Sequence, residues 1–365
     1  MVLKEKLDFP RGGTVLRHHE ASPAAARPMR ARDVLDTLAR RGFSRDESTV
    51  AFNHLLAGDY SEIEMAGVLI AFKTRGETPE VMAGAVEALL AAAIPFARPD
   101  YQYADCCGTG GDGTSTFNIS TAAAFVAAEI GIPIAKAGNR SVSSRCGSAD
   151  VLEQLGVRLD PTPEVSRRCL DELGICFVFA PHYHPGVRRA VAVRRALGVR
   201  TVFNLVGPIA NAARPPWQMM GIYDPLLCEP AARTLQLLGR EVALVLHGSG
   251  LDEVALHGPT TGVLVQGGEL RHVTIDPSDA GLAPVPMESL TGAGPEENAE
   301  WLFELLSGKG RSTHADAVAI NVGVLAWATG FASTIRHGSR LARQALDGGG
   351  GARRLSRLIE LSHSA

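Results

Sequence analysis

The run Asp105-Cys106-Cys107-Gly108-Thr109-Gly110-Gly111-Asp112-Gly113 is followed closely by Thr116-Phe117-Asn118-Ile119-Ser120-Thr121. Four glycines thus precede an Asn/Ser/Thr cluster that opens an alanine-rich helix. Glycines let a backbone approach a ligand without a Cβ in the way, and N–H groups at the start of a helix point at an anion. This combination predicts a binding site for a polyphosphate. An ordinary glycine turn between a strand and a helix is the alternative interpretation.

The segments that flank this loop predict an α/β fold. Helical segments alternate with short strands, which are expected at Tyr103–Cys107, Ile132–Lys136, Ile175–Ala180, Glu241–His247 and Val254–His257. The wholly apolar run from Ile175 to Ala180 is typical of a strand that is covered on both faces. Such alternation indicates a large α/β domain with a mostly parallel central sheet.

The N-terminal part of the chain predicts a small all-helical domain. Residues 1–28 lack periodicity and are expected to form a mobile arm. Residues 29–98 have helical periodicity, and residues from about 185 to 216 are helical enough to join them in space. The large domain then comprises residues 99–184 and 217–365. Helix starts in the N-terminal part are marked by capping signals at Ser44–Glu47, Ser61–Glu64 and Thr78-Pro79-Glu80.

Composition narrows the classes of function. The chain has 365 residues, of which 45% are hydrophobic and 21% charged, as in a globular protein with a sizeable core. A net charge of −3 argues against a nucleic-acid-binding protein. No apolar run is long enough to span a bilayer, and the start of the chain lacks the layout of a signal peptide. The six cysteines show no metal-binding spacing, which favours reduced thiols and a cytoplasmic location.

An acidic pair, Asp252-Glu253, follows a glycine turn after a buried strand. Carboxylate oxygens in such a position are ligands that Mg²⁺ prefers. A solvated acidic turn is the alternative when the pair is considered alone. Together with the glycine loop, the pair predicts a magnesium–polyphosphate site.

Several single residues also suggest anion binding. Lys136 ends a strand and can reach a phosphate as a point charge, although a solvated lysine is the alternative. Ser143, Ser144 and Ser148 are weaker candidates for further hydrogen bonds to it.

Arg194 lies on one helical face with Val187, Ala190 and Val191, and its planar guanidinium suits a carboxylate. An internal salt bridge is the alternative. His182 and His184, beside Pro185, are candidates for an acid, a base or an aromatic contact. A packed or exposed histidine is the favoured interpretation of either residue alone.

Assembled in order, these motifs resemble the anthranilate phosphoribosyltransferase family from about residue 29 to the C-terminus. The matching runs are Gly108–Asp112, Phe117–Thr121, Gly138–Ser144, His184-Pro185, Arg194, Arg200–Pro208, Gly250–Glu253 and Glu297–Glu300. The resemblance implies a small helical domain, a large α/β domain, a hinge between them and a homodimer through the helical domain.

The resemblance also implies roles for individual residues. Those expected to bind phosphoribosyl pyrophosphate (PRPP) are Gly108, Thr109, Gly110, Gly111, Asp112, Thr116, Asn118, Ser120, Thr121, Lys136 and Ser148. Those expected to bind the acceptor, an aromatic amine carboxylate, are Gly108, Asn139, His184 and Arg194. Asp252, Glu253 and Ser120 are expected to bind Mg²⁺. Pyrophosphate would then leave C1′ of the ribose as the acceptor amine attacks from the opposite face, and no side chain is assigned as a general base.

One residue departs from the family pattern on the acceptor side. The family usually has His after the lysine of this motif, where the chain has Ala137. A substituted anthranilate or another aminobenzoate is therefore an alternative acceptor. A nucleoside phosphorylase of related fold and a non-catalytic nucleic-acid-binding relative are further alternatives. The acidic pair argues against the first of these, and the net negative charge argues against the second.

Overall fold

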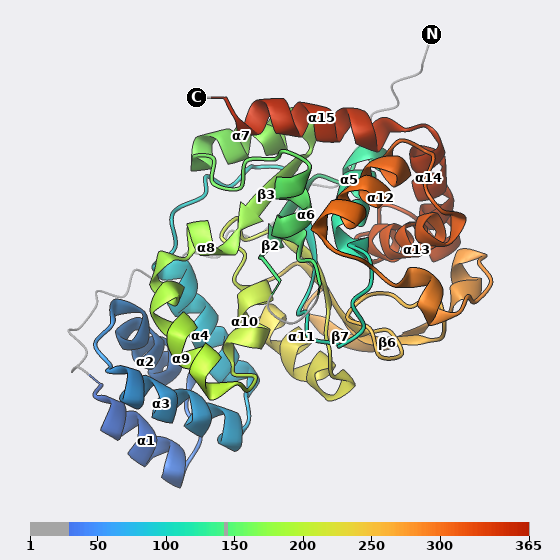
Figure 1. Cartoon of the computed structure of the whole chain (residues 1–365). Coiled ribbons are helices and arrows are strands. Elements are labelled where there is room, and N and C mark those ends of the chain that lie inside the picture. The colour runs from blue at the N-terminus through green and yellow to red at the C-terminus, as the bar shows by residue number, and fades with distance from the viewer. Residues whose placement is uncertain (1–28, 142–144, 365) are drawn as a thin grey trace.

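A computed structural model describes residues 29–141 and 145–364, and the predicted arm at residues 1–28 lies outside this range (Figure 1). Seven strands form one sheet in the order β3-β2-β1-β4-β5-β6-β7. The strands are β1 (Ala104–Gly108), β2 (Ile134–Gly138), β3 (Ile175–Phe179), β4 (Trp217–Gly221), β5 (Val242–His247), β6 (Thr260–Gln266) and β7 (Glu269–Ile275). All neighbouring pairs from β3 to β5 are parallel, and β6 and β7 are antiparallel additions at one edge. The prediction of an α/β fold with a mostly parallel sheet is confirmed.

Both faces of the sheet are covered, so successive strand residues enter different hydrophobic cores. On β1, Cys106 belongs to one core and Cys107 to the other. On β5, Leu244 lies in the first core and Val245 in the second. This two-sided burial explains why the central strands read as continuous apolar runs.

The first core lies against helices that belong to the large α/β part. They are α5 (Ile119–Ile130), α6 (Ser148–Gln154), α7 (Pro163–Leu173), α12 (Pro295–Leu306), α13 (Ser312–Ala328), α14 (Ile335–Asp347) and α15 (Gly350–Ser362). On the other face, α11 (Cys228–Leu237) packs on β5 and β6.

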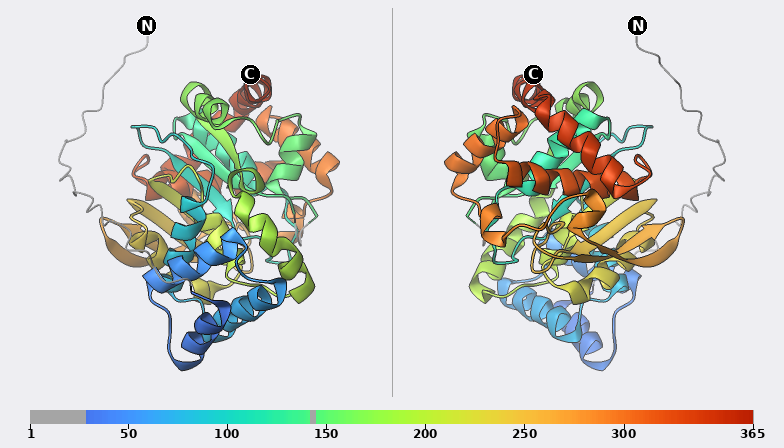
Figure 2. Two further views of the ribbon diagram at one scale, coloured as in Figure 1. Left: turned by 90° about the vertical axis from the view of Figure 1, so that its left-hand side faces the viewer. Right: turned by 90° about the vertical axis from the view of Figure 1, so that its right-hand side faces the viewer.

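The second core continues from α11 into a group of helices that we call the helical domain. It contains α1 (Ala31–Arg40), α2 (Arg45–Ala57), α3 (Glu62–Arg75), α4 (Pro79–Ala91), α9 (Arg188–Leu197) and α10 (Phe203–Ile209). Here α9 packs on α3, α10 packs on α4, and the ring of Phe52 lies 5.9 Å from that of Phe203. Figure 2 shows this domain at one end of the molecule and α15 at the other.

Local capping explains where several of these helices begin. Reciprocal capping boxes join Ser44 to Glu47 and Ser61 to Glu64, and the Thr78 hydroxyl accepts a hydrogen bond from the Val81 N–H. The three predicted helix starts are therefore confirmed. In the described part of the chain, none of the helices has the length and apolar character that crossing a membrane requires.

The expected strand at Val254–His257 is wrong. Val254 and Ala255 have no regular secondary structure, Leu256 and His257 lie in a bend, and the antiparallel pair β6–β7 follows instead. Gly267 and Gly268 both have positive φ and form the tight turn between the two strands. Because β7 is a largely exposed edge strand, its sequence lacks the apolar run that marks the central strands.

Candidate active site

The glycine loop and the acidic pair meet at the carboxyl edge of the sheet. β1, β2 and β4 are adjacent and parallel, so the loops that follow them lie at the same edge. There the Gly110 N–H donates to Oδ2 of Asp252 at 2.6 Å, and the Ser120 N–H donates to Oε1 of Glu253 at 3.0 Å. Asp252 thus contacts the glycine loop and Glu253 contacts the first turn of α5, although both acids lie more than a hundred positions further along the chain.

Two glycines permit this close approach. A Cβ on Gly108 would lie 2.2 Å from Oδ2 of Asp252, and a Cβ on Gly221 would lie 1.6 Å from the Asp252 backbone oxygen. Real Cβ atoms do not come so close to other atoms, so the strand ends must lack side chains for the acidic pair to lie between them.

The side chains of the acidic pair are half-buried, and this changes their electrostatics. Burial, followed by the charges of Glu253 and Asp112, raises the pKa of the Asp252 carboxyl well above its usual range. Burial also raises the pKa of Glu253 to about 7, although the nearby Lys136 ammonium opposes that rise. A divalent cation would stabilise both carboxylates in their charged form. No group of three or more His, Cys, Asp or Glu arranged for metal binding occurs within residues 29–141 and 145–364, so further oxygens would have to come from the Ser120 hydroxyl and from a bound ligand.

Lys136 lies behind the first turn of α5. Its side chain is only 3% exposed, and Nζ donates to the Cys106 carbonyl at 2.8 Å and to the Ser120 hydroxyl at 3.3 Å. The ammonium therefore supports Ser120 and faces the charge of Glu253. Its predicted contact with a phosphate stays a prediction.

Asp105 is a buried carboxylate that the sequence did not single out. It is 0% exposed and accepts hydrogen bonds from the Ala137 N–H at 3.0 Å and from Nδ2 of Asn211 at 2.9 Å. Burial raises the pKa of Asp105, and Lys136 opposes that rise. Asp105 thus joins β1, the end of β2 and the segment that returns from α10 to β4. The one signal in the sequence for this role is that Asp105 directly precedes the two cysteines and the glycine loop.

The other residues of the predicted PRPP site hold the surrounding loops together. Asn118 donates to the Cys146 carbonyl at 3.3 Å and accepts from Nδ2 of Asn298 at 3.0 Å. Thr109 accepts from the Tyr223 N–H at 3.1 Å through its hydroxyl. Asp112 accepts from both the N–H and the hydroxyl of Thr114, at 3.0 and 2.7 Å. Thr116 pairs with Thr291 in an isolated bridge, and Thr121 is buried in α5.

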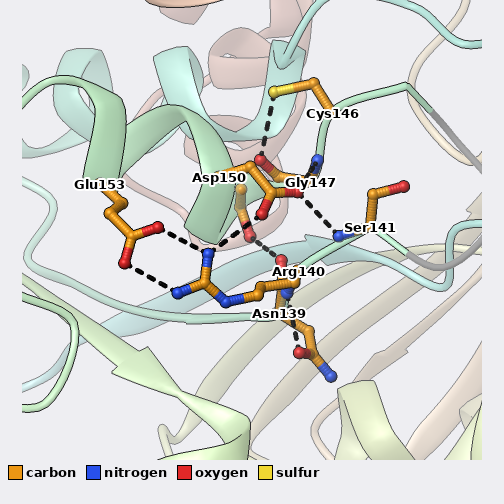
Figure 3. Close-up of polar contacts among 8 residues, drawn as sticks. Asn139, Arg140, Ser141, Cys146, Gly147, Asp150 and Glu153 are labelled. Atoms are coloured by element: carbon orange, nitrogen blue, oxygen red, sulfur yellow. Dashed lines mark hydrogen bonds and ion pairs between the residues drawn. The ribbon is translucent and has the colours of Figure 1, made fainter. Parts of the chain in front are cut away.

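The loop after β2 is attached to the start of α6 (Figure 3). Asp150 accepts from the N–H groups of Ser141 and Gly147, both at 2.9 Å, and Arg140 binds both carboxylate oxygens of Glu153. Ser148 donates to the Asn139 carbonyl at 3.4 Å. Asn139 and Ser148 are therefore neighbours, whereas the candidates Ser143 and Ser144 lie outside the described residues.

Arg194 has the unpaired charge that the sequence suggested. It forms no ion pair within the described residues, and its guanidinium lies over the Phe203 ring at 5.3 Å from the centroid. Burial lowers its pKa. The apolar face is less complete than expected, because Val191 is 42% exposed whereas Ala190 is buried. A half-buried arginine without a carboxylate partner suits an anionic ligand.

His184 is engaged with the backbone. It is 8% exposed, and its ring nitrogens lie 2.7 Å from the Ala210 carbonyl and 3.3 Å from the Leu89 carbonyl. Burial lowers its pKa, which favours the neutral ring. This geometry favours a structural role where the chain crosses between the two parts of the molecule, and acceptor binding by His184 stays a prediction.

Comparison with known proteins places these features in a family. Residues 33–93 match the helical bundle domain of a glycosyl transferase family, and residues 100–352 match its a/b domain. Anthranilate phosphoribosyltransferase from Sorangium cellulosum is 57% identical over 90% of this chain and 95% of its own length, and that from Tolumonas auensis is 46% identical over 90% and 99%.

Solved structures of anthranilate phosphoribosyltransferases have the same fold as this chain. The anthranilate phosphoribosyltransferase of Thermus thermophilus superposes with a TM-score of 0.86 at 39% identity, covering 91% of this chain and 100% of that one. The Saccharomyces cerevisiae enzyme in complex with PRPP and Mg gives a TM-score of 0.84 at 25% identity, covering 92% and 98%.

Proposed function

Because the chain belongs to the anthranilate phosphoribosyltransferase family, we propose that its glycine-loop site binds PRPP and Mg²⁺. The enzyme transfers the phosphoribosyl group from PRPP to the amine of anthranilate and releases pyrophosphate, a step of tryptophan biosynthesis. The observation that carries the assignment is the 2.6 Å contact between the Gly110 N–H and Asp252, which brings an anion cradle and a metal-binding carboxylate into one site.

The residues present fit a magnesium ion. Asp252 and Glu253 are half-buried carboxyls whose pKa values are raised, and Ser120 lies beside them. We assign these three residues to the ion. When bound, Mg²⁺ supplies positive charge that offsets the charge on the departing pyrophosphate.

The chain's own groups orient the two substrates. The N-terminus of α5 favours an anion at the phosphate end. Two N–H groups at this end, those of Gly110 and Ser120, donate to the carboxylates of Asp252 and Glu253 and so place the proposed metal ligands beside the phosphates. Asn139 and Arg194 bind the acceptor, with Arg194 on its carboxylate. Holding the amine opposite the leaving group contributes up to roughly 7–11 kcal/mol in favourable cases, so a covalent intermediate is not required.

Replacing Arg194 by Ala is expected to raise the KM for the acceptor about 10- to 100-fold, the loss typical of a hydrogen-bonded charge pair. The KM for PRPP should change little. Steady-state kinetics with each substrate varied in turn measures both constants. Equal increases in the two would contradict the assigned role. Arg195→Ala is the matched control, because Arg195 is an exposed neighbour.

An acceptor screen tests the proposed reaction. Pyrophosphate release is measured with PRPP, Mg²⁺ and either anthranilate or ring-substituted anthranilates. Release with anthranilate is the expected result. Preference for a substituted analogue would point to the alternative that Ala137 opens, a specialised aminobenzoate acceptor. Phosphate-dependent cleavage of uridine or thymidine would overturn phosphoribosyl transfer altogether.

We further propose a homodimer through the helical domain and a cytoplasmic location. Two apolar side chains on the packed helices α3 and α9 support the dimer, because Ile63 is 86% and Val191 42% exposed. Light scattering is expected to show a dimer for the wild type. For Ile63→Asp, it is expected to show a dimer that dissociates at higher protein concentration than the wild type. All six cysteines are free and buried, as suits a reducing compartment.

A further inference from the structure

Arg200 links the helical domain to the glycine loop. It lies between α9 and α10, yet its guanidinium donates to the Gly111 carbonyl of the loop that follows β1. The same guanidinium stacks on the Tyr223 ring, 3.8 Å from the ring centroid. The Tyr223 N–H in turn donates to the hydroxyl of Thr109 at 3.1 Å. The arginine and the tyrosine thus hold the loop at two successive points.

The loop needs such external contacts. Gly110, Gly111 and Gly113 all have positive φ, and glycine is the residue that loses most conformational freedom when it is fixed. Before Gly111, the loop is held by the contacts of Gly110 with Asp252 and of the Thr109 N–H with the Gly221 carbonyl. At Gly111 itself, Arg200 is the contact that fixes the direction of the peptide group.

Arg200 is also positively charged without a carboxylate partner within residues 29–141 and 145–364. Burial raises the pKa of Tyr223, and the nearby acids Glu77 and Asp224 add to that rise. Neither acid forms an ion pair with Arg200. A guanidinium has five N–H donors in a fixed plane, so the stack and one carbonyl do not exhaust them. An unpaired planar cation beside an anion-binding loop favours binding of the anion.

We propose that Arg200 is a positioning residue for the pyrophosphate end of PRPP, acting by fixing Gly111 and so keeping the loop N–H groups directed at the anion. This inference rests on the proposed function of the site. Because Arg200 comes from the segment between α9 and α10, it also makes the conformation of the loop depend on the helical domain.

The test is the binding of Mg²⁺–PRPP and of Mg²⁺–pyrophosphate, measured by calorimetry without acceptor, together with steady-state kinetics. Arg200→Ala is expected to weaken both ligands and to raise the KM for PRPP about 30-fold or more, the loss expected from one charged hydrogen bond and one exposed cation–π contact. The acceptor KM should stay at the wild-type value. Tyr223→Leu removes the stack alone and should change the same constants in the same direction by a smaller factor.

Two further variants, Arg200→Lys and Arg195→Ala, test whether Arg200 positions the loop. Arg200→Lys keeps the charge but cannot stack and bridge in the same plane, so it should restore only part of the affinity. Full restoration by lysine would overturn positioning in favour of charge alone. Arg195→Ala removes an exposed arginine of the same region, and an equal loss of PRPP affinity in that variant would also overturn the inference. If the wild type itself binds no Mg²⁺–PRPP, the proposed function is wrong. If the wild type binds it and Arg200→Ala binds it equally well, only the positioning role of Arg200 is wrong.

Discussion

Replacing Asp252 by Asn together with Glu253 by Gln is expected to lower the rate of phosphoribosyl transfer on the order of 10²- to 10³-fold, as when one strong electrostatic contact to a transition state is lost. The shape of the site should be preserved, because an amide oxygen can still accept from the Gly110 and Ser120 N–H groups. The loss should appear chiefly as weak, metal-independent use of PRPP. Rates measured across a magnesium titration give the effect, and a wild-type response to Mg²⁺ would contradict the metal assignment.

Removing the charge of the acidic pair is expected to lower activity but to raise the folding stability of the protein. The pKa of Glu253 is about 7 in the folded protein, above the ordinary value of 4.5, so folding favours its protonated form. Its contribution to stability is present below the ordinary pKa and is lost as the pH rises towards and through about 7. At a pH of about 8 without Mg²⁺, Glu253→Gln is therefore expected to be more stable by roughly 3 kcal/mol. Urea unfolding in the presence of a chelator measures this, and added Mg²⁺ should stabilise the wild type alone.

Replacing Gly221 by Ala is expected to be the most disruptive single methyl addition near the site. The new Cβ would lie 1.6 Å from the Asp252 backbone oxygen and 2.2 Å from its carbonyl carbon, so either β4 or the acidic turn must move. Overpacking against backbone of this kind costs about 3 kcal/mol. The displaced Asp252 should also lose affinity for Mg²⁺–PRPP.

Urea unfolding and calorimetry measure the two effects of Gly221→Ala. Gly207→Ala is the matched control, since a Cβ there meets no atom within 4 Å. That control should keep the stability of the wild type within about 1 kcal/mol. A Gly221→Ala protein with wild-type stability and affinity would show that the acidic turn can move freely, contrary to the geometry described above.

Much of the architecture was predictable because its signals are local. Capping boxes at Ser44 and Ser61 involve residues three apart, and the apolar run of β3 records burial on both faces directly in the sequence. The β6–β7 pair was not predicted, because an exposed edge strand has no need of apolar residues on both faces.

The candidate site was predictable to a different degree. The glycine loop and Asp252-Glu253 carry their chemistry in their residue types. The buried role of Asp105 depends on Asn211, which lies 106 positions away, and the contact of Arg200 with Gly111 spans 89 positions. A single sequence gives no sign of such pairings. Lys136 shows the same difficulty, since only the fold reveals that its ammonium supports Ser120.

The helical domain is built from two stretches of chain, α1–α4 and α9–α10, and the strands β1, β2 and β3 lie between these stretches in the sequence. During synthesis on the ribosome, α1–α4 emerge well before Phe203, whose ring packs near that of Phe52. The apolar surface of α4 that α10 and α11 cover therefore stays open until the chain has been translated past those helices. A nascent chain that stalls before α10 accordingly leaves this apolar surface of α4 open to solvent, even though its first four helices have already been made.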